Sequence, residues 1–295
     1  MRNLDKETYK IIKDYCHYTN NLYNYALYIT REYFKETNKY LGYYDIIKEV
    51  KDNENYKLLP SQVAQQVIKV LDKDFQSFFT LLRKKNKGKY TSNVNIPKFK
   101  KKGNCFNLVF PSQTGIIRNN QIILSSSLYY NKQKNIKSKI FIPFSYKLNG
   151  ILKQIIIKPY NNGQYFKMFI QYEENKKDKL ELDKSKYLSI DLGINNLASC
   201  FDTFGHSFIM NGKPLKSYNK WYNQTKAKLK SKLPKNIHWS KRLTKLEWDR
   251  SNYIDNYFNQ CVNKIIKYCI ENNIGNIIIG DRKSTRLNSS HESPS

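Results

Sequence analysis

The spacing of the apolar residues changes twice along the chain, and these changes limit the folds open to it. In residues 5 to 36 the apolar side chains recur every three or four positions, which places them on one stripe of a helix: Ile12, Tyr15, Cys16, Leu22, Tyr23, Ala26 and Leu27. A run after Pro60, with Ser61 as the expected N-cap, has the same spacing: Val63, Val67, Val70, Leu71, Phe75, Phe78, Phe79 and Leu82. Residues 1–104 are therefore predicted to form a helical lobe.

Short β-type runs replace the helical spacing between residues 105 and 175. They are CFNLVF, IIRNNQIIL, KIFIPF, LKQIIIKPY and QYFKMFIQYEE. The last two are separated by Asn-Asn-Gly at 161–163, which predicts a hairpin turn because Asn and Gly tolerate positive φ. We expect a small antiparallel β-barrel or sheet over 105–178.

A polar linker, ENKKDKLELDKSK, follows and predicts a domain boundary. Beyond it the pattern predicts three strands (187–191, 197–202 and 206–210), two helices (216–233 and 250–273) and an all-apolar strand that starts at 276, suited to a buried parallel position. This order is similar to that of an RNase H-like half-domain over 179–280. The predicted fold class is thus α+β and multidomain: helical lobe, small β-barrel, and partial RNase H-like domain.

The charge balance favours nucleic acid as a partner. The chain has 52 Lys and Arg against 24 Asp and Glu, a formal net charge of +28. AT-rich codons would enrich Lys, but they would enrich Asp and Glu as well. The five cysteines form no CxxC pair, and no apolar run is long enough to span a membrane. We expect a cytoplasmic, nucleoid-associated protein of prokaryotic type with no membrane partner.

A basic segment at 83–104 is predicted to be a loop, because Gly88, Pro97 and Gly103 interrupt it. Basic groups alternate there with aromatic rings that can stack on bases, which favours nucleic-acid binding over a solvated charged face. The candidate residues are Arg83, Lys84, Lys85, Lys87, Lys89, Tyr90, Lys98, Phe99, Lys100, Lys101 and Lys102.

The stretch YLSIDLGINNLASC places one carboxylate, Asp191, in the first strand of the last domain. By itself an Asp before a Gly is ordinary turn chemistry. In an RNase H-like order this Asp lies beside the end of the fourth strand, where acidic groups hold divalent metal ions for phosphodiester hydrolysis. Carboxylate oxygens are the ligands that Mg²⁺ prefers.

Other chemistry-bearing residues of this part are weaker candidates. Asp202 lies in FDTFG, where a hairpin turn accounts for it, and the single histidines 17, 206 and 238 are too scattered to be ligands. A further set of lysines fits either a strand channel or a solvated helix face: Lys226, Lys228, Lys230, Lys232 and Lys235.

Four motifs resemble the TnpB (OrfB) family of transposon-encoded, RNA-guided nucleases, which are relatives of the type V CRISPR effectors. They are NLYNYALYITREYF at 21–34, LPSQVAQQVIKVLDKDFQSFF at 59–79, IPKFKKKG at 96–103 and SIDLGINNLAS at 189–199. The resemblance implies a recognition lobe, a wedge-like β domain and a RuvC nuclease domain that cuts DNA chosen by a guide RNA. It makes Asp191 the first catalytic, Mg²⁺-binding carboxylate, with guide RNA and target DNA as partners.

The end of the sequence departs from the family pattern. Further acidic residues and a zinc ribbon of CxxC pairs are expected after the fourth strand, so Zn²⁺ is expected only in a C-terminal part that this sequence lacks. Residues 281–295, DRKSTRLNSSHESPS, begin like a translated sequencing-library adapter, and Asp281 is then not a catalytic residue. We expect a truncated, inactive fragment of a Mg²⁺-dependent endonuclease. The alternatives are a non-catalytic nucleic-acid-binding relative and a transposase that acts without a guide.

Overall fold

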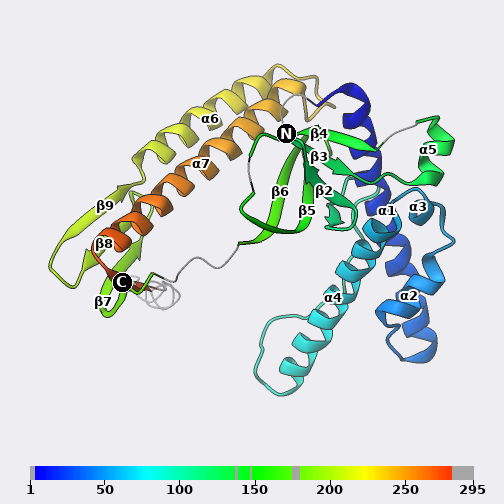
Figure 1. The fold of residues 1–295 in the computed structure, drawn as a ribbon, viewed down its shortest axis with the longest axis horizontal. Helices are drawn as coiled ribbons and strands as arrows, with labels where there is room; N and C mark the ends of the chain where they lie inside the picture. The colour runs from blue at the N-terminus through cyan, green and yellow to red at the C-terminus, as the bar shows by residue number, and fades with distance from the viewer. Residues whose placement is uncertain (1–3, 137–138, 147, 175–179, 281–295) are drawn as a thin grey trace, which may run out of the picture. The chain divides into compact units, whose positions relative to one another are not determined.

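The computed structural model describes residues 4–136, 139–146, 148–174 and 180–280 and consists of two compact units (Figure 1). Unit 1 is Met1–Lys177 and unit 2 is Asp178–Ser295. Both combine helices with small sheets, so the predicted α+β class is confirmed. The division between the units falls within the polar linker.

Two long helices form the frame of unit 1, and both follow the predicted apolar spacing. Helix α1 (Lys6–Thr37) begins at Asp5, whose carboxylate accepts a hydrogen bond from the Thr8 N–H at 2.8 Å, and it ends at Asn38 with φ 53°. All seven residues of its predicted stripe are buried. Helix α4 (Ser61–Asn86) buries Val63, Val67, Leu71 and Phe75. Ser61 is its first helical residue, because Pro60 occupies the N-cap position instead.

Three short helices of unit 1 have no counterpart in the sequence analysis: α2 (Tyr43–Val50), α3 (Glu54–Lys57) and α5 (Leu128–Lys134). Each is too short for a 3.6-residue period to be visible. Local capping marks two of them, since Asn53 accepts from the Asn55 N–H and Ser127 accepts from the Tyr130 N–H.

The β part of unit 1 is two three-stranded antiparallel sheets, and the described residues form no closed barrel. One sheet has the order β1-β5-β6, from β1 (Leu108–Pro111), β5 (Gly150–Tyr160) and β6 (Tyr165–Glu174). The other has the order β2-β3-β4, from β2 (Gly115–Arg118), β3 (Gln121–Leu124) and β4 (Ile140–Pro143). The barrel prediction was wrong because alternation fixes which face of a strand is apolar, whereas pairing partners are set in three dimensions.

Positive-φ asparagines make the turns of these sheets. Asn161, Asn162 and Gly163 all have positive φ, so the predicted hairpin turn is confirmed. The run IIRNNQIIL is two strands rather than one, because Asn119 and Asn120 have φ of 51° and 56° and reverse the chain between β2 and β3.

The helices and sheets of unit 1 share one hydrophobic core. Buried side chains from α1 and α4 pack with those of β1, β3, β4 and β5, including Tyr15, Leu71, Phe110 and Ile155. Hydrogen bonds also join the helices to the sheets: the Tyr9 hydroxyl of α1 donates to the Gly163 carbonyl, between β5 and β6, at 2.8 Å. The predicted helical lobe and the β segment that follows it, up to Lys177, are therefore parts of a single compact unit.

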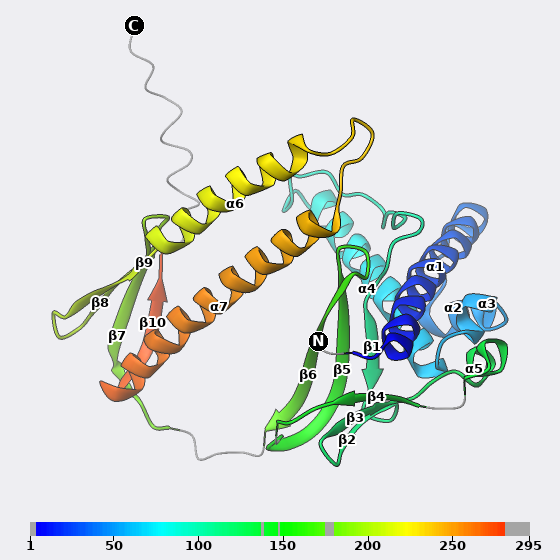
Figure 2. The same cartoon turned by 90° about the horizontal axis from the view of Figure 1, so that it is seen from above.

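Unit 2 contains one four-stranded sheet of order β10-β7-β8-β9 (Figure 2). A meander of β7 (Asp183–Leu192), β8 (Asn196–Asp202) and β9 (Ser207–Asn211) is antiparallel, and β10 (Ile274–Ile279) pairs with β7 in parallel. Gly275 permits the close approach of β10, because a Cβ there would lie 2.6 Å from the Asp183 carbonyl oxygen. The strand order and directions agree with the sequence pattern.

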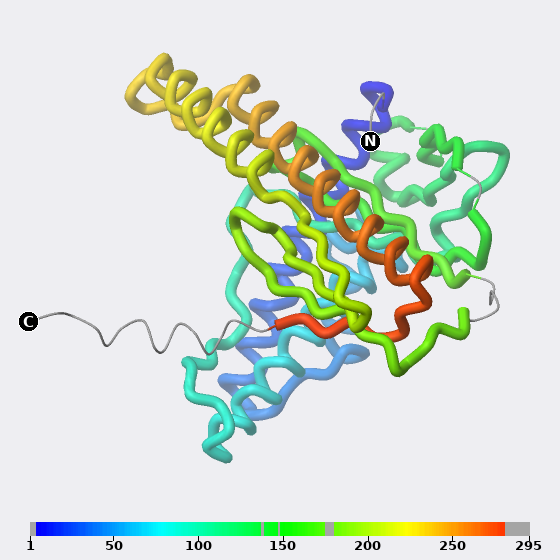
Figure 3. The backbone as a smooth tube through the Cα atoms, turned by 90° about the vertical axis from the view of Figure 1, so that its left-hand side faces the viewer, coloured from blue at the N-terminus to red at the C-terminus, as the bar shows by residue number. Residues whose placement is uncertain are grey.

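Two helices connect β9 to β10. Helix α6 (Lys213–Ser231) and helix α7 (Lys241–Glu271) lie side by side as an antiparallel hairpin (Figure 3). The end of α7 packs Ile265, Tyr268 and Cys269 against Leu188, Ile190 and Cys200 of the sheet. One face of the sheet is thereby covered.

Candidate nucleic-acid interface and carboxylate site

Asp191 lies near the C-terminal end of β7, at the sheet edge where β10 also ends. It pairs across β7–β8 with Ser199, and its neighbour Ile190 pairs with Ile279, the last residue of β10. The Gly280 N–H donates to the Ile190 carbonyl at 3.0 Å, which fixes the end of β10 at this level. Side chains alternate along a strand, so Asp191 is on the face opposite the buried Leu188 and Ile190 and is exposed.

The described residues by themselves do not fit a magnesium site. Within 4–136, 139–146, 148–174 and 180–280, no group of three or more His, Cys, Asp or Glu side chains could hold a metal ion. Mg²⁺ needs an octahedral set of oxygen ligands, and Asp191 supplies one carboxylate. Asp281 and the rest of 281–295 lie outside the described residues.

Asp202 is a structural residue of the β8–β9 hairpin. Its carboxylate has no exposed surface and accepts hydrogen bonds from the Tyr268 hydroxyl (2.6 Å) and from the N–H groups of Phe204 (2.9 Å) and His206 (2.8 Å). Burial raises the pKa of Asp202, but these hydrogen bonds outweigh burial and hold the pKa at about 2. The hydrogen bond that the Tyr268 hydroxyl donates to Asp202 raises the pKa of Tyr268 to about 12. The turn role expected for Asp202 agrees with this geometry.

The first part of the basic segment is helical and not a loop. Helix α4 continues to Asn86, so Arg83, Lys84 and Lys85 form its last turn, and the chain leaves the helix only at Gly88, with φ 68°. Cations are favourable at a helix C-terminus, and no Gly or Pro precedes residue 88 to end the helix earlier. The basic side chains of residues 83–89 are all exposed, and Tyr90 is half-buried.

The second part, residues 97–102, is fixed against α1. Asn24 accepts from the Lys100 N–H (2.8 Å) and donates to the Lys100 carbonyl (2.8 Å), and Asn20 donates to the Lys101 carbonyl (3.1 Å). The Arg31 guanidinium donates to the Pro97 carbonyl and lies 4.7 Å from the centre of the Phe99 ring. Residues 97–102, which we call the strap, are therefore held against α1, with one side facing the helix and the other exposed.

The contacts with α1 divide the predicted binding lysines of the strap into a half-buried and an exposed group. The Lys100 ammonium lies 3.9 Å from the ring centres of both Tyr23 and Phe106, and loss of water around it lowers its pKa. Lys100 is thus directed into the protein. The side chains of Lys98, Lys101 and Lys102 are exposed and available to phosphates.

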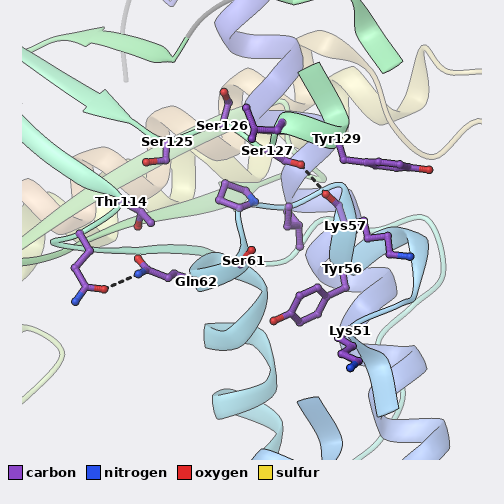
Figure 4. Close-up of a pocket in the computed structure, with 14 residues that line it drawn as sticks. Lys51, Tyr56, Lys57, Ser61, Gln62, Thr114, Ser125, Ser126, Ser127 and Tyr129 are labelled. Carbon is purple, nitrogen blue, oxygen red and sulfur yellow. Dashed lines mark hydrogen bonds between the residues drawn. The ribbon is translucent and has the colours of Figure 1, made fainter. Parts of the chain in front are cut away.

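The structure also contains a cavity of about 590 Å³ in unit 1, lined by polar and apolar side chains, that the sequence did not predict (Figure 4). Its walls are Ser61 and Gln62 at the start of α4, Lys51 and Lys57 beside them, and the serines 125–127. The Gln62 amide donates to Gln113 at 2.5 Å, while its carbonyl oxygen is buried and lacks a partner among the described residues. These residues are spread over 51–129, so no local pattern could have revealed the cavity.

The fold is that of a two-unit α+β protein with an exposed basic strap, and comparison with known proteins shows what the chain resembles. Residues 169–286 match the OrfB_IS605 family model, described as a probable transposase. This segment confirms the predicted resemblance to the transposon-associated TnpB (OrfB) family. No curated protein matches the chain.

One solved structure shares the fold at low sequence identity. A cryo-EM structure of the Cas12f1–sgRNA–target DNA complex matches with a TM-score of 0.58 and 13% identity, covering 98% of this chain and 69% of that chain. A CRISPR–Cas12f ternary complex matches with a TM-score of 0.36 and 14% identity, covering 96% and 68% of the two chains. No helix among the described residues is long and apolar enough to cross a membrane.

Proposed function

We propose that this chain binds a guide RNA and the DNA that the guide selects, and that unit 2 is the first part of a RuvC-like nuclease domain. The observation that carries the proposal is the position of Asp191 at the end of β7, beside the end of the parallel strand β10, within the segment that matches the transposase family. The likeness to a complex that contains a guide RNA and target DNA supports nucleic acid as the partner.

The binding surface that we propose is the end of α4 together with the strap. Arg83, Lys84 and Lys85 present charge at the helix end, and Lys98, Lys101 and Lys102 present it on the strap. Neutralising phosphates with exposed cations releases counterions, so this surface binds strands with little regard to sequence. Sequence would then be selected by pairing with the guide.

In the nuclease that we propose, Asp191 is the first magnesium ligand. Bound Mg²⁺ would activate water and stabilise the leaving oxygen of a phosphodiester. The remaining carboxylates must come from outside the described residues, because no metal-binding cluster forms among those that the structure describes. Because Asp191 has no metal-binding cluster around it among the described residues, we also propose a second function, namely binding of nucleic acid without cleavage.

Three experiments test the proposal. RNA extracted from the purified chain should include a discrete species, and its absence would favour a transposase that acts without a guide.

Sequencing the source DNA across codon 280 should show a reading frame that continues into further Asp or Glu codons. In a protein expressed from that frame, Asp191→Ala should abolish Mg²⁺-dependent cleavage and leave DNA binding within a few-fold. Retained cleavage would contradict the role of Asp191.

A further inference from the structure

The α6–α7 hairpin of unit 2 carries a long stretch without acidic residues. Between Asp202 and Glu247 the sequence contains no Asp or Glu and eleven basic residues: Lys213, Lys216, Lys220, Lys226, Lys228, Lys230, Lys232, Lys235, Lys241, Arg242 and Lys245. Glu247 pairs with Lys226 at 2.9 Å, on the side of α6 that faces α7. The outer lysines of α6 therefore form a strongly positive surface.

Trp221 lies in the middle of this surface with 49% of its area exposed. Its ring centre is 5.2 Å from that of Tyr218, which stacks on Tyr253 of α7 at 4.0 Å with an angle of 8° between the ring planes. Tyr253 is followed by Tyr257, at 6.5 Å and 19°. The exposed indole is thus one end of a continuous set of rings that reaches α7.

Further contacts join α6 to α7 beside this ring set. The Arg250 guanidinium lies 4.8 Å from the centre of the Tyr222 ring and donates to the Asn219 side chain at 2.7 Å. The Tyr257 hydroxyl donates to the Asn211 carbonyl where α6 begins. A tryptophan side chain has only two rotatable bonds, so it loses little conformational freedom when a second ring stacks on it.

The residues in line with Trp221 are also exposed and polar or basic. Positions 217, 221, 224, 228 and 232 are spaced by four, three, four and four residues, which keeps the first four on one face of α6 and puts position 232, the C-cap residue, next in the same series. They are Ser217, Trp221, Gln224, Lys228 and Lys232, and all are exposed. Lys228 lies two turns from Trp221, about 10.5 Å along the axis. We call this set the α6 row.

We propose that the α6 row binds an unpaired polynucleotide strand, with one base stacked on Trp221 and phosphates against Lys228 and Lys232. A duplex would not fit this face equally well, because base faces inside a duplex are covered by their neighbours and an isolated ring cannot reach them. The proposal rests on the nucleic-acid binding proposed above and adds a strand-selective site in unit 2. It requires no nuclease activity.

The test is equilibrium binding of the full chain to labelled 12-mers of dT and of U, and to a DNA duplex of the same length, by fluorescence anisotropy. Trp221→Ala should weaken single-strand binding about tenfold, equivalent to about 1.4 kcal/mol, and duplex binding less than twofold. Trp221→Phe should restore most of the loss, since a phenyl ring still stacks. Lys228→Gln with Lys232→Gln should reduce the salt slope for the single strands by about 1.4.

Phe258→Ala is the matched control, because Phe258 is 43% exposed on α7 and lies outside the α6 row. It should leave single-strand affinity unchanged. Circular dichroism spectra of all variants exclude loss of fold as the cause. Quenching of tryptophan fluorescence by dT or U should be smaller in Trp221→Phe than in the parent chain.

The outcomes separate this proposal from the proposed function. If the parent chain binds none of the three ligands, both are overturned. If it binds them but Trp221→Ala binds single strands as tightly as the parent, or loses duplex affinity equally, the α6 row is not a single-strand site and the proposed function stands. Equal losses with dT and U assign the row to either strand type, and a loss confined to U assigns it to RNA.

Discussion

Replacing Lys100 by Met tests whether this lysine of the strap has a structural role, in contrast to the nucleic-acid-binding role that we propose for its neighbours. Sequence spacing places Lys100 in one group with Lys98, Lys101 and Lys102, but its ammonium lies between the Tyr23 and Phe106 rings. Met keeps most of the length and volume of the side chain and removes only the charge. The substitution should lower the stability of unit 1 and leave nucleic-acid binding almost unchanged.

The expected magnitude follows from two ring contacts and partial burial. A cation over one aromatic ring contributes about 0.5 kcal/mol when exposed and about 2 kcal/mol when desolvated. Both rings lie at 3.9 Å, but desolvation of Lys100, which lowers its pKa, offsets part of the gain. We expect a net loss of about 1 kcal/mol, which lowers the Tm of a unit of this size by about 2 to 4 °C.

Scanning calorimetry measures this loss, and tryptophan fluorescence assigns the transitions. All three tryptophans, at 221, 239 and 248, belong to unit 2, so a heat-capacity peak without a change in tryptophan emission reports on unit 1. Lys101→Met is the matched control, because Lys101 is the exposed neighbour. It should leave the Tm of unit 1 unchanged and reduce the salt slope of duplex binding by about 0.9.

Identical behaviour of Lys100→Met and Lys101→Met would contradict the half-buried position of the Lys100 ammonium. An unchanged Tm with a reduced salt slope would show that the Lys100 ammonium contacts phosphate and does not lie between the rings. A loss of stability together with a large loss of affinity would show that strap docking and binding are not separable.

Three further predictions concern the strap and the β8–β9 hairpin. Changing Lys98, Lys101 and Lys102 together to Gln should weaken DNA binding and reduce the salt slope by about 2.7 with no change in Tm, and an unchanged slope would make these lysines a solvated face. The pKa of Asp202 is about 2 in the folded chain against an ordinary 3.8, so the ionised carboxylate stabilises unit 2 above pH 3.8 and this stabilisation is lost as the pH falls through 2. The Tm of unit 2, followed by tryptophan fluorescence, should therefore fall over this pH range in the parent chain. The fall should be smaller in Asp202→Asn. Tyr268→Phe should lower the unit 2 Tm at neutral pH, since the buried carboxylate loses a donor.

The sequence alone determined the elements that depend on long local patterns. Apolar spacing over more than twenty residues located α1 and α4 with their buried faces, and the order of strands and helices after residue 186 anticipated the parallel pairing of β10 with β7. Four motifs pointed to the TnpB (OrfB) family. Each of these features extends over many consecutive residues, so the local amino-acid sequence contains enough information to identify it.

Tertiary structure decided which residues meet. Alternation did not reveal that the strands of unit 1 form two open sheets, and composition did not distinguish Lys100 from Lys101, although the two adjacent side chains have opposite surroundings. The cavity at the start of α4 and the ring set behind Trp221 join residues distant in the sequence. Charge and hydrophobicity are properties of single residues, whereas burial and contact depend on packing between segments, and only the folded chain specifies that packing.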